Sequence, residues 1–438
     1  MYNPGKNKKH FFYYYLLLIA LVLLSSRVLG QETKQVLVIK VTGIINPVSS
    51  EFIGTNIVRA NEMQAEALVI ELDTPGGLDT SMRDIVKNII SSSVPVVVYV
   101  APSGARAASA GTFITLAAHV AAMAPGTNIG AAHPVSMGGK MDETMAAKAT
   151  NDAAAYIRSL AERTGRNAKW AEDAVRKSIS ATETEALKEN VIDMVSKDLS
   201  ALLKDIDGKK VTTASGEKTL KTADSTVTRR EAGLRYKILS FISDPSVAYL
   251  LLLLGFYGLF FELTNPGTIF PGVTGAIFLI LAFYSFQTLP VNYAGLLLIG
   301  LAIILFILEI MIVSAGLLTI GGIISMIFGS LMLFESPAPF FRISLSLVIP
   351  AAILTAVFFT ATLRLAYKAL RTKTSTGGEG LVGTDGKAVT DITKVGGTAA
   401  VRGELWSAFS DDTIKKGETV EIVSLSGLKI YVKKKEVV

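Results

Sequence analysis

A serine within a run of small residues is the first candidate for chemistry in this chain. Ser109 lies in ARAASAGTFI (105–114), where an apolar helical stretch begins. A serine at a strand-to-helix turn can present its hydroxyl outward, although small neighbours are also typical of a helix packed tightly against a sheet. Because a serine hydroxyl is a weak nucleophile by itself, catalysis would need a base and oxyanion donors elsewhere in the sequence.

The stretch DTPGG (73–77) could supply such donors. Its two consecutive glycines, Gly76 and Gly77, allow backbone N–H groups to point into a site. The N–H of Ala110, directly after the serine, can supply another donor. Together these amides would stabilise the oxyanion that develops during acyl transfer.

Two residues could act as the base. His133 lies in GAAHPV, and Lys148 lies in the helical stretch MAAKATNDAAAYIRSLAERTGRN. A lysine can accept a proton where apolar surroundings favour its uncharged amine, and alanines flank Lys148; the alternative is an ordinary exposed helix lysine. Lys140 is a weaker rival. Asp193 is the nearest candidate to orient a histidine, and its pattern is weak.

The elements around these motifs predict a parallel sheet. VLVIKVTG, ALVIELDTPGG and VPVVVYVAPSG are short apolar strands, and stretches with helical spacing separate them between residues 36 and 123. Such alternation is typical of βαβ units with helices on both faces. In these sheets chemistry takes place beyond the carboxyl ends of the strands, where DTPGG and ARAASAG both fall. This placement favours a functional reading of Ser109.

Composition limits the classes of function. The chain has 438 residues, too many for one compact domain, and a net charge of +6. It has no cysteine, which excludes disulfides, thiolate metal sites and a cysteine nucleophile. With three histidines and no basic stripe interleaved with aromatics, we expect no metal, no cofactor and no nucleic-acid partner.

The amino end resembles a secretory signal. Three lysines at positions 6, 8 and 9 precede the run FFYYYLLLIALVLL, and SSRVLG follows it. We therefore predict a signal peptide over 1–30, cleaved after Gly30, with an uncleaved anchor as the alternative. In either case the domain predicted over 31–230 is exported.

Residues 231–370 predict a membrane region. Residues 231–245 form an amphipathic linker helix at the membrane surface, and 246–370 form a membrane domain. About five spans are expected, with four or six also possible: 246–262, 269–287, 293–312, 315–334 and 344–367. The basic residues at 364–373 place the end of the last span on the cytoplasmic side. Glu262 and Glu309, at span boundaries, are either functional acids or caps, and caps are favoured.

After a glycine-rich linker, residues 376–438 contain about five short alternating strands with turn residues between them. This pattern predicts a small barrel of the OB type. Its charges nearly balance, which indicates contact with protein rather than nucleic acid.

Taken in order, DTPGG, GARAASAGTFI, MAPGTNIGAAHPV and AAKATNDAAAYIRSLAERTGRN closely resemble the NfeD-type membrane serine proteases. The resemblance covers nearly the whole chain. It implies an α/β domain similar to the Clp protease proteolytic subunit and the crotonases, an all-α multi-span membrane domain and an all-β OB-like barrel. It also implies a Ser109–Lys148 dyad that cleaves hydrophobic segments of stomatin/prohibitin-type membrane proteins. We further expect contact with membrane lipid and a homo-oligomer, a dimer or higher.

Three alternatives stay open. The Clp subunit itself uses a Ser–His–Asp triad, and His133 precedes a proline as its histidine does, so a Ser–His mechanism through His133 is possible. A non-catalytic scaffold for stomatin-like proteins would fit the spans and barrel, but the serine and the glycines are intact. An acyl-CoA enzyme of the crotonase type would share the paired amides, but acyl-CoA is cytoplasmic and this domain is predicted to be exported.

Overall fold

The computed structural model describes residues 14–16, 34–135, 142–264, 267–289, 291–312, 316–334, 336, 342–371 and 380–435. The chain forms two compact units, Met1–Ile303 with Ile324–Ala351, and Ile304–Ile323 with Ala352–Val438. Apart from 14–16, the predicted signal peptide lies outside the described residues.

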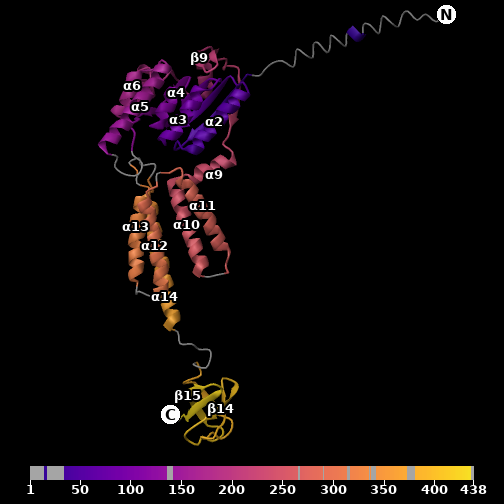
Figure 1. Cartoon of the computed structure of the whole chain (residues 1–438). Helices are drawn as coiled ribbons and strands as arrows, with labels where there is room; N and C mark the ends of the chain where they lie inside the picture. Colours follow the sequence, from indigo (N-terminus) through magenta and orange to yellow (C-terminus); the bar gives the residue numbers. More distant parts are fainter. Residues whose placement is uncertain are drawn as a thin grey trace, which may run out of the picture. The chain divides into compact units, whose positions relative to one another are not determined.

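A parallel sheet of six strands forms the centre of the amino-terminal domain (Figure 1). Its spatial order is β11-β1-β2-β3-β5-β8, and each neighbouring pair is parallel. The strands are β1 (Gln35–Thr42), β2 (Ala67–Asp73), β3 (Val96–Val100), β5 (Val120–Met123), β8 (Met194–Val195) and β11 (Thr226–Arg230). The parallel sheet predicted from the apolar runs is therefore confirmed. The edge strand β11 was not predicted.

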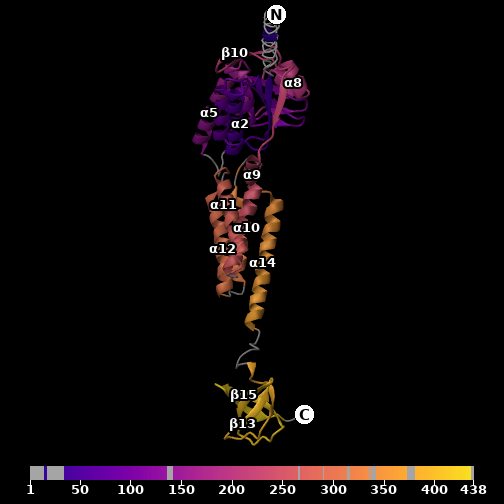
Figure 2. The same ribbon diagram turned by 90° about the vertical axis from the view of Figure 1, so that its right-hand side faces the viewer.

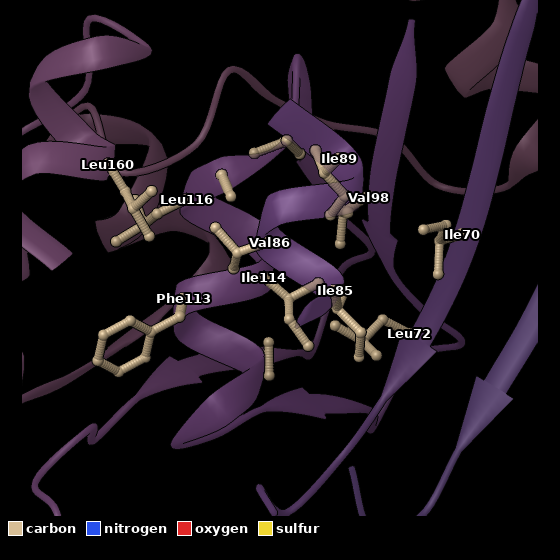
Figure 3. Close-up of a cluster of buried hydrophobic side chains, with 14 of the residues drawn as sticks. Ile70, Leu72, Ile85, Val86, Ile89, Val98, Phe113, Ile114, Leu116 and Leu160 are labelled. Carbon is tan, nitrogen blue, oxygen red and sulfur yellow. The ribbon is translucent and has the colours of Figure 1, made fainter. Parts of the chain in front are cut away.

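Helices cover both faces of this sheet because its strands are buried on both sides. They are α2 (Pro47–Glu62), α3 (Asp79–Ile90), α4 (Ala110–Ala117), α5 (Glu143–Arg163), α6 (Ala168–Arg176), α7 (Glu183–Lys188) and α8 (Leu199–Asp205). On one face, side chains of β2 and β3 meet those of α3, α4 and α5 in the main core (Figure 3). On the other, Val69, Val97 and Tyr99 pack with Leu202, Leu203 and neighbouring side chains of α8. This packing fixes where the loops after the strands meet.

Shorter strands complete the domain. A three-stranded sheet contains β4 (Arg106–Ala107), β6 (Asn128–Gly130) and β7 (Ser180–Thr182), and a hairpin contains β9 (Lys210–Thr213) and β10 (Gly216–Thr219). The hairpin falls within 205–228, where a hairpin or linker was expected.

Six further helices follow. They are α9 (Leu234–Ile242), α10 (Pro245–Thr264), α11 (Phe270–Phe286), α12 (Tyr293–Ile312), α13 (Leu317–Leu333) and α14 (Leu345–Arg371). The helix α9 occupies the predicted amphipathic segment and exposes Leu234, Ile238 and Phe241. Within the described residues, one helix, Pro245–Leu263, is long and apolar enough to cross a membrane, and four apolar helices are shorter. Five helices thus stand where five spans were predicted.

The two acids at the span boundaries bind backbone and hydroxyl donors. Glu309 is buried, and its carboxylate accepts hydrogen bonds from the N–H groups of Gly316 and Thr319, at 2.9 and 3.0 Å. Glu262 accepts one from the hydroxyl of Thr268, at 2.9 Å. Because these donors lie in the turn or at the start of the following helix, both acids act as caps.

The carboxyl-terminal strands close into a barrel of order β12-β13-β14-β16-β15 (Figure 2). They are β12 (Asp385–Ala388), β13 (Gly397–Val401), β14 (Glu404–Phe409), β15 (Thr419–Ser426) and β16 (Lys429–Lys434). Alternate residues such as Val420, Ile422, Ile430 and Val432 fill its interior. The predicted fold class of α/β domain, helical membrane region and OB-like barrel is confirmed.

A partly buried histidine makes the α/β domain sensitive to acid. His119 Nδ1 accepts a hydrogen bond from the Val96 N–H at 3.0 Å, which requires an unprotonated nitrogen. Burial, followed by repulsion from Arg163 and Arg166, lowers the pKa of His119 to about 4. Between pH 6.5 and 4 the unfolded chain takes up a proton that the folded domain does not. The free energy of unfolding should therefore fall by about 3 kcal/mol as the pH drops through this window.

Urea unfolding followed by Trp170 fluorescence in a Trp406→Phe background would measure this loss. His119→Gln keeps an acceptor for Val96 but cannot be protonated, so it should remove this component and leave only the titration of the carboxylates. Equal pH dependence in the two proteins would contradict the assignment.

Candidate active site

The loops after β2 and β3 are joined at one edge of the sheet. The Thr74 N–H donates to the Arg106 carbonyl at 2.8 Å, and the Ala108 N–H donates to the Thr74 carbonyl at 3.1 Å. These bonds continue strand-like pairing beyond the end of β2. They bring the DTPGG and ARAASAG stretches together at the carboxyl ends of the strands, as predicted.

Ser109 lies at a strained turn between β4 and α4. Its φ is +51° and its ψ is −113°, a conformation that non-glycine residues rarely adopt, and it is the N-cap of α4. Its N–H donates to the Ala131 carbonyl at 2.8 Å, which holds the turn in place. The serine of a nucleophile elbow has this type of strained strand-to-helix geometry, which exposes its hydroxyl.

The two glycines of DTPGG are tightly packed, Gly76 against this turn and Gly77 against Ile45. A Cβ at Gly76 would lie 2.6 Å from the Cβ of Ser109 and 3.1 Å from its Oγ, and Gly76 has a φ of +121°. A Cβ at Gly77 would lie 2.0 Å from the Ile45 carbonyl oxygen. Neither position can therefore carry a side chain without displacing its surroundings.

Two amides near the serine are free to bind a ligand. In the described part of the chain, the N–H groups of Gly77 and Ala110 have no hydrogen-bond partner. The Gly76 N–H, by contrast, donates to the Thr74 hydroxyl at 3.0 Å. The structural role of Thr74 was not predicted, and its only sequence signal is its place within DTPGG. Of the proposed donors, Gly77 and Ala110 are the available pair.

Lys148 lies in the second turn of α5, exposed and without contact to Ser109 among the described residues. The helices α4 and α5 run in the same direction, because the Phe113 ring stacks on the Tyr156 ring with centroids 6.0 Å apart and, further along both helices, the Thr164 hydroxyl donates to the Leu116 carbonyl at 3.1 Å. Lys140 lies outside the described residues.

His133 lies in an exposed segment two residues beyond Ala131. Its Nδ1 lies 2.8 Å from the Val175 carbonyl oxygen and so donates to it. In the residues described here, no carboxylate bonds this ring. A neutral His133 would therefore keep Nε2 as its acceptor, but without the acid of a triad.

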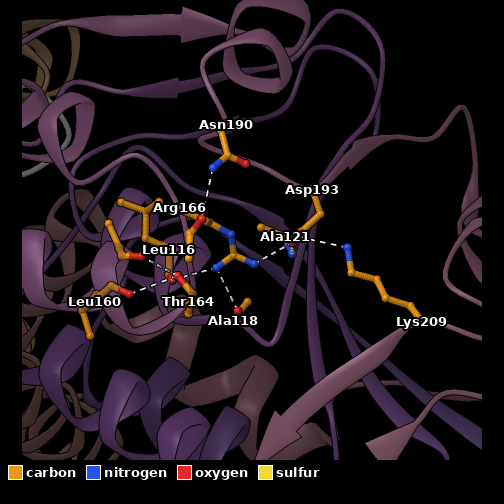
Figure 4. A network of polar contacts seen from close by, with 11 residues as sticks. Leu116, Ala118, Ala121, Leu160, Thr164, Arg166, Asn190, Asp193 and Lys209 are labelled. Carbon is orange, nitrogen blue, oxygen red and sulfur yellow. Dashed lines mark hydrogen bonds and ion pairs between the residues drawn. The ribbon is translucent and has the colours of Figure 1, made fainter.

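Asp193 belongs to a different network (Figure 4). Its carboxylate pairs with Arg166 at 2.6 Å and Lys209 at 3.0 Å, and it accepts the Ala121 N–H at 2.7 Å. Burial alone would raise the pKa of Asp193, but the attraction of Arg166 and the hydrogen bond from Ala121 outweigh it and hold the pKa below its usual range. Both oxygens are therefore used in linking the start of β5 to the segment around Arg166.

A strained serine beside two free amides at a sheet edge is the arrangement of a serine hydrolase that works by acyl transfer. In the described residues, no group of three or more His, Asp or Glu side chains could hold a metal ion.

Comparison with known domains and proteins specifies the family. Residues 35–225 match the NfeD1b N-terminal domain, 246–365 the NfeD integral membrane domain, and 378–434 the NfeD-like C-terminal, partner-binding domain. The membrane-bound protease PH1510 of Pyrococcus horikoshii is 39% identical over 425 residues, covering 94% of this chain and 96% of that protein. The membrane protein NfeD1b of Bacillus subtilis is 28% identical over 433 residues, with the same two coverages.

Among solved structures, the chain is similar to the 1510-N membrane-bound stomatin-specific protease. A lysine-to-alanine mutant of it, in complex with a substrate peptide, is 38% identical and covers 48% of this chain and 98% of that chain, with a TM-score of 0.46. A serine-to-alanine mutant is 39% identical and covers 46% and 99%, with a TM-score of 0.43.

The chain belongs to the NfeD family, to the members that carry a Clp-type serine protease domain, and it is an integral membrane protein. The resemblance drawn from the four sequence motifs is confirmed.

The close approach of Gly76 to Ser109 makes a specific prediction. Gly76→Ala should displace the serine by the bulk of one methyl group and slow its acylation by a fluorophosphonate probe roughly a hundredfold, because small misplacements at a reacting centre have such effects. Gly104→Ala is the matched control, since Gly104 also has a positive φ (+87°) but nothing within 4 Å of its Cβ position. If both variants label at the same rate, the contact does not position Ser109.

Proposed function

We propose that this chain is a membrane-bound serine endopeptidase that cleaves hydrophobic segments of partner membrane proteins of the stomatin/prohibitin type. The observation that carries the proposal is Ser109 at a strained turn against Gly76, beside the unpaired amides of Gly77 and Ala110. The substrate class comes from the relatives, which include a membrane-bound protease at 39% identity and a stomatin-specific protease.

The reaction follows from the roles of four groups. Ser109 Oγ attacks the scissile carbonyl carbon while Lys148 Nζ accepts the hydroxyl proton. The carbonyl oxygen becomes an oxyanion and receives hydrogen bonds from Gly77 and Ala110. Collapse breaks the C–N bond, and the leaving amine takes the proton from the Lys148 ammonium. Water, activated by Lys148, then hydrolyses the Ser109 ester and releases the acid product.

Two observations support Lys148 as the base. The helix that carries it runs in the same direction as α4, which begins directly after Ser109. His133 is bound to the Val175 carbonyl and has no carboxylate to orient it among the described residues. Lys148 is exposed in the free enzyme, but a hydrophobic substrate lying across the edge would remove water from it and favour the uncharged amine.

The test is a variant series in the full chain, measured by fluorophosphonate labelling and by cleavage of an apolar peptide. Ser109→Ala should abolish both. Lys148→Ala should lower kcat by orders of magnitude. Lys148→Arg should be as damaging, because a guanidinium group keeps its proton at the pH of any such assay. His133→Ala should retain much of the activity.

Each contrary result points to a different alternative. Near-native cleavage by Ser109→Ala would remove the nucleophile assignment, and no Ser109-dependent cleavage in the wild type would favour a scaffold. An active Lys148→Arg enzyme with an inactive His133→Ala variant would move the mechanism to histidine.

The predicted domain boundaries are part of the proposal, with the protease domain outside the cytoplasm and the barrel inside. The support is the signal-like start and the basic cluster at 364–373. Barrel lysines are neutralised by ion pairs such as Lys433 with Glu421 at 3.1 Å and Lys434 with Glu418 at 2.6 Å. This balance suits a protein partner, and the matched domain family is described as partner-binding. A homo-oligomer stays a prediction.

Protease treatment of intact spheroplasts that express the full chain tests this topology. Residues 31–230 should be accessible to cleavage from outside, and 376–438 should be protected until the cells are lysed. Degradation of 376–438 in intact spheroplasts would contradict the orientation.

A further inference from the structure

Arg83 contacts three groups one turn into α3. Its Nε lies 2.8 Å from Asp79 Oδ2, its Nη2 pairs with Asp152 of α5, and its guanidinium lies 4.5 Å from the centroid of the Tyr156 ring. Burial alone would lower the pKa of Arg83, but the two carboxylates outweigh it and raise the pKa. The side chain therefore stays charged and joins the first turn of α3 to α5.

The ion pair between Arg83 and Asp152 lies one helical turn beyond Asp79 on α3 and one turn beyond Lys148 on α5. Asp79 precedes Arg83 by four residues on α3, and Lys148 precedes Asp152 by four on α5. On α4, Phe113 follows Ser109 by four residues, and its ring stacks on Tyr156, which lies eight residues beyond Lys148. Arg83 thus connects the helix that follows Gly77 with the helix that carries Lys148.

The spacing of Lys148 and Asp152 lets Lys148 compete with Arg83 for the Asp152 carboxylate. Residues four apart on a helix face one another, and a carboxylate beside an ammonium stabilises the protonated form. A protonated Lys148 held by Asp152 could not accept the Ser109 proton. The contact with Arg83 instead occupies Asp152.

We propose that Arg83 is a positioning residue that binds Asp152 and thereby prevents Asp152 from pairing with Lys148. This inference takes the catalytic role of Lys148 from the proposed function. The competition between Arg83 and Lys148 for Asp152 does not depend on that role.

Other charged groups near this part of α5 are already paired or lie at its start. On α3, Asp79 binds Arg83. On α6, Arg176 bonds Asn151 at 2.7 Å and pairs with Glu172, which also pairs with Arg158. At the start of α5, Asp142 caps the Thr144 N–H, and Glu143 lies in the first turn. Among these carboxylates, Asp152 is therefore the one whose release from its ion pair would most favour the protonated form of Lys148.

The test measures protonation of Lys148 without relying on protease activity. The full chain in detergent is acetylated with limiting acetic anhydride across a pH series, and mass spectrometry gives the pH of half-maximal acetylation at Lys148. Arg83→Met should raise this midpoint by about half a pH unit, since it removes a cation and frees Asp152. Arg83→Met combined with Asp152→Asn should bring it back to within about a quarter of a unit of the wild type. Arg83→Lys, whose compact ammonium lacks the planar fork that lets Nε bind Asp79 while Nη2 binds Asp152, should lie between.

Arg158→Met is the matched control, because Arg158 also forms exposed ion pairs on α5 but one turn and a half beyond Asp152. It should leave the midpoint unchanged. Equal midpoints in the wild type, Arg83→Met and the double variant would overturn the inference, as would a shift that Asp152→Asn does not reverse. Fluorophosphonate labelling of the same samples reports Ser109 separately. A midpoint shift without Ser109 labelling would thus retain the inference and reject the proposed function.

Discussion

The side chain of Ser109 lies against Gly76 with no space between them for another carbon atom. This approach requires the DTPGG loop to be held rigidly, which the bonds from Thr74 to Arg106 and Ala108 achieve. On its other side, the loop is fixed by the Ile45 N–H, which donates to the Gly76 carbonyl at 2.8 Å. The left-handed conformation of Ser109 costs on the order of 1–3 kcal/mol, which the surrounding core offsets. The turn that exposes the Ser109 hydroxyl therefore lowers the local stability of the fold.

Much of this arrangement could be predicted from the sequence because it depends on local patterns. Continuous apolar strands, a double glycine and a serine among small residues each have a signature within about ten positions. The parallel sheet then places the loops after β2 and β3 at the same edge without further information. The barrel strands likewise followed from alternation and turn residues.

Features that depend on distant partners had no such signature. The polar strand β11 (TVTRR) has no apolar run, and its place beside β1 depends on a pairing nearly two hundred residues apart. Asp193 looked like a possible orienter of histidine, but its charge is used by Arg166 and Lys209. The sequence did not single out Arg83. Its contacts with Asp152 and Tyr156 arise only when α3 and α5 pack together.

The parallel course of α3, α4 and α5 also affects what leaves the site. Each helix amino terminus carries a partial positive charge, and acids in the first turn offset it at α3 and α5. The helix α4, which begins directly after Ser109, has no acid in its first turn. Its positive end is therefore uncompensated at the point where the reaction proposed for Ser109 would generate a new carboxylate. Of the two product fragments, the one that ends in this carboxylate would be held by the field of α4, and the fragment with the new amine would not.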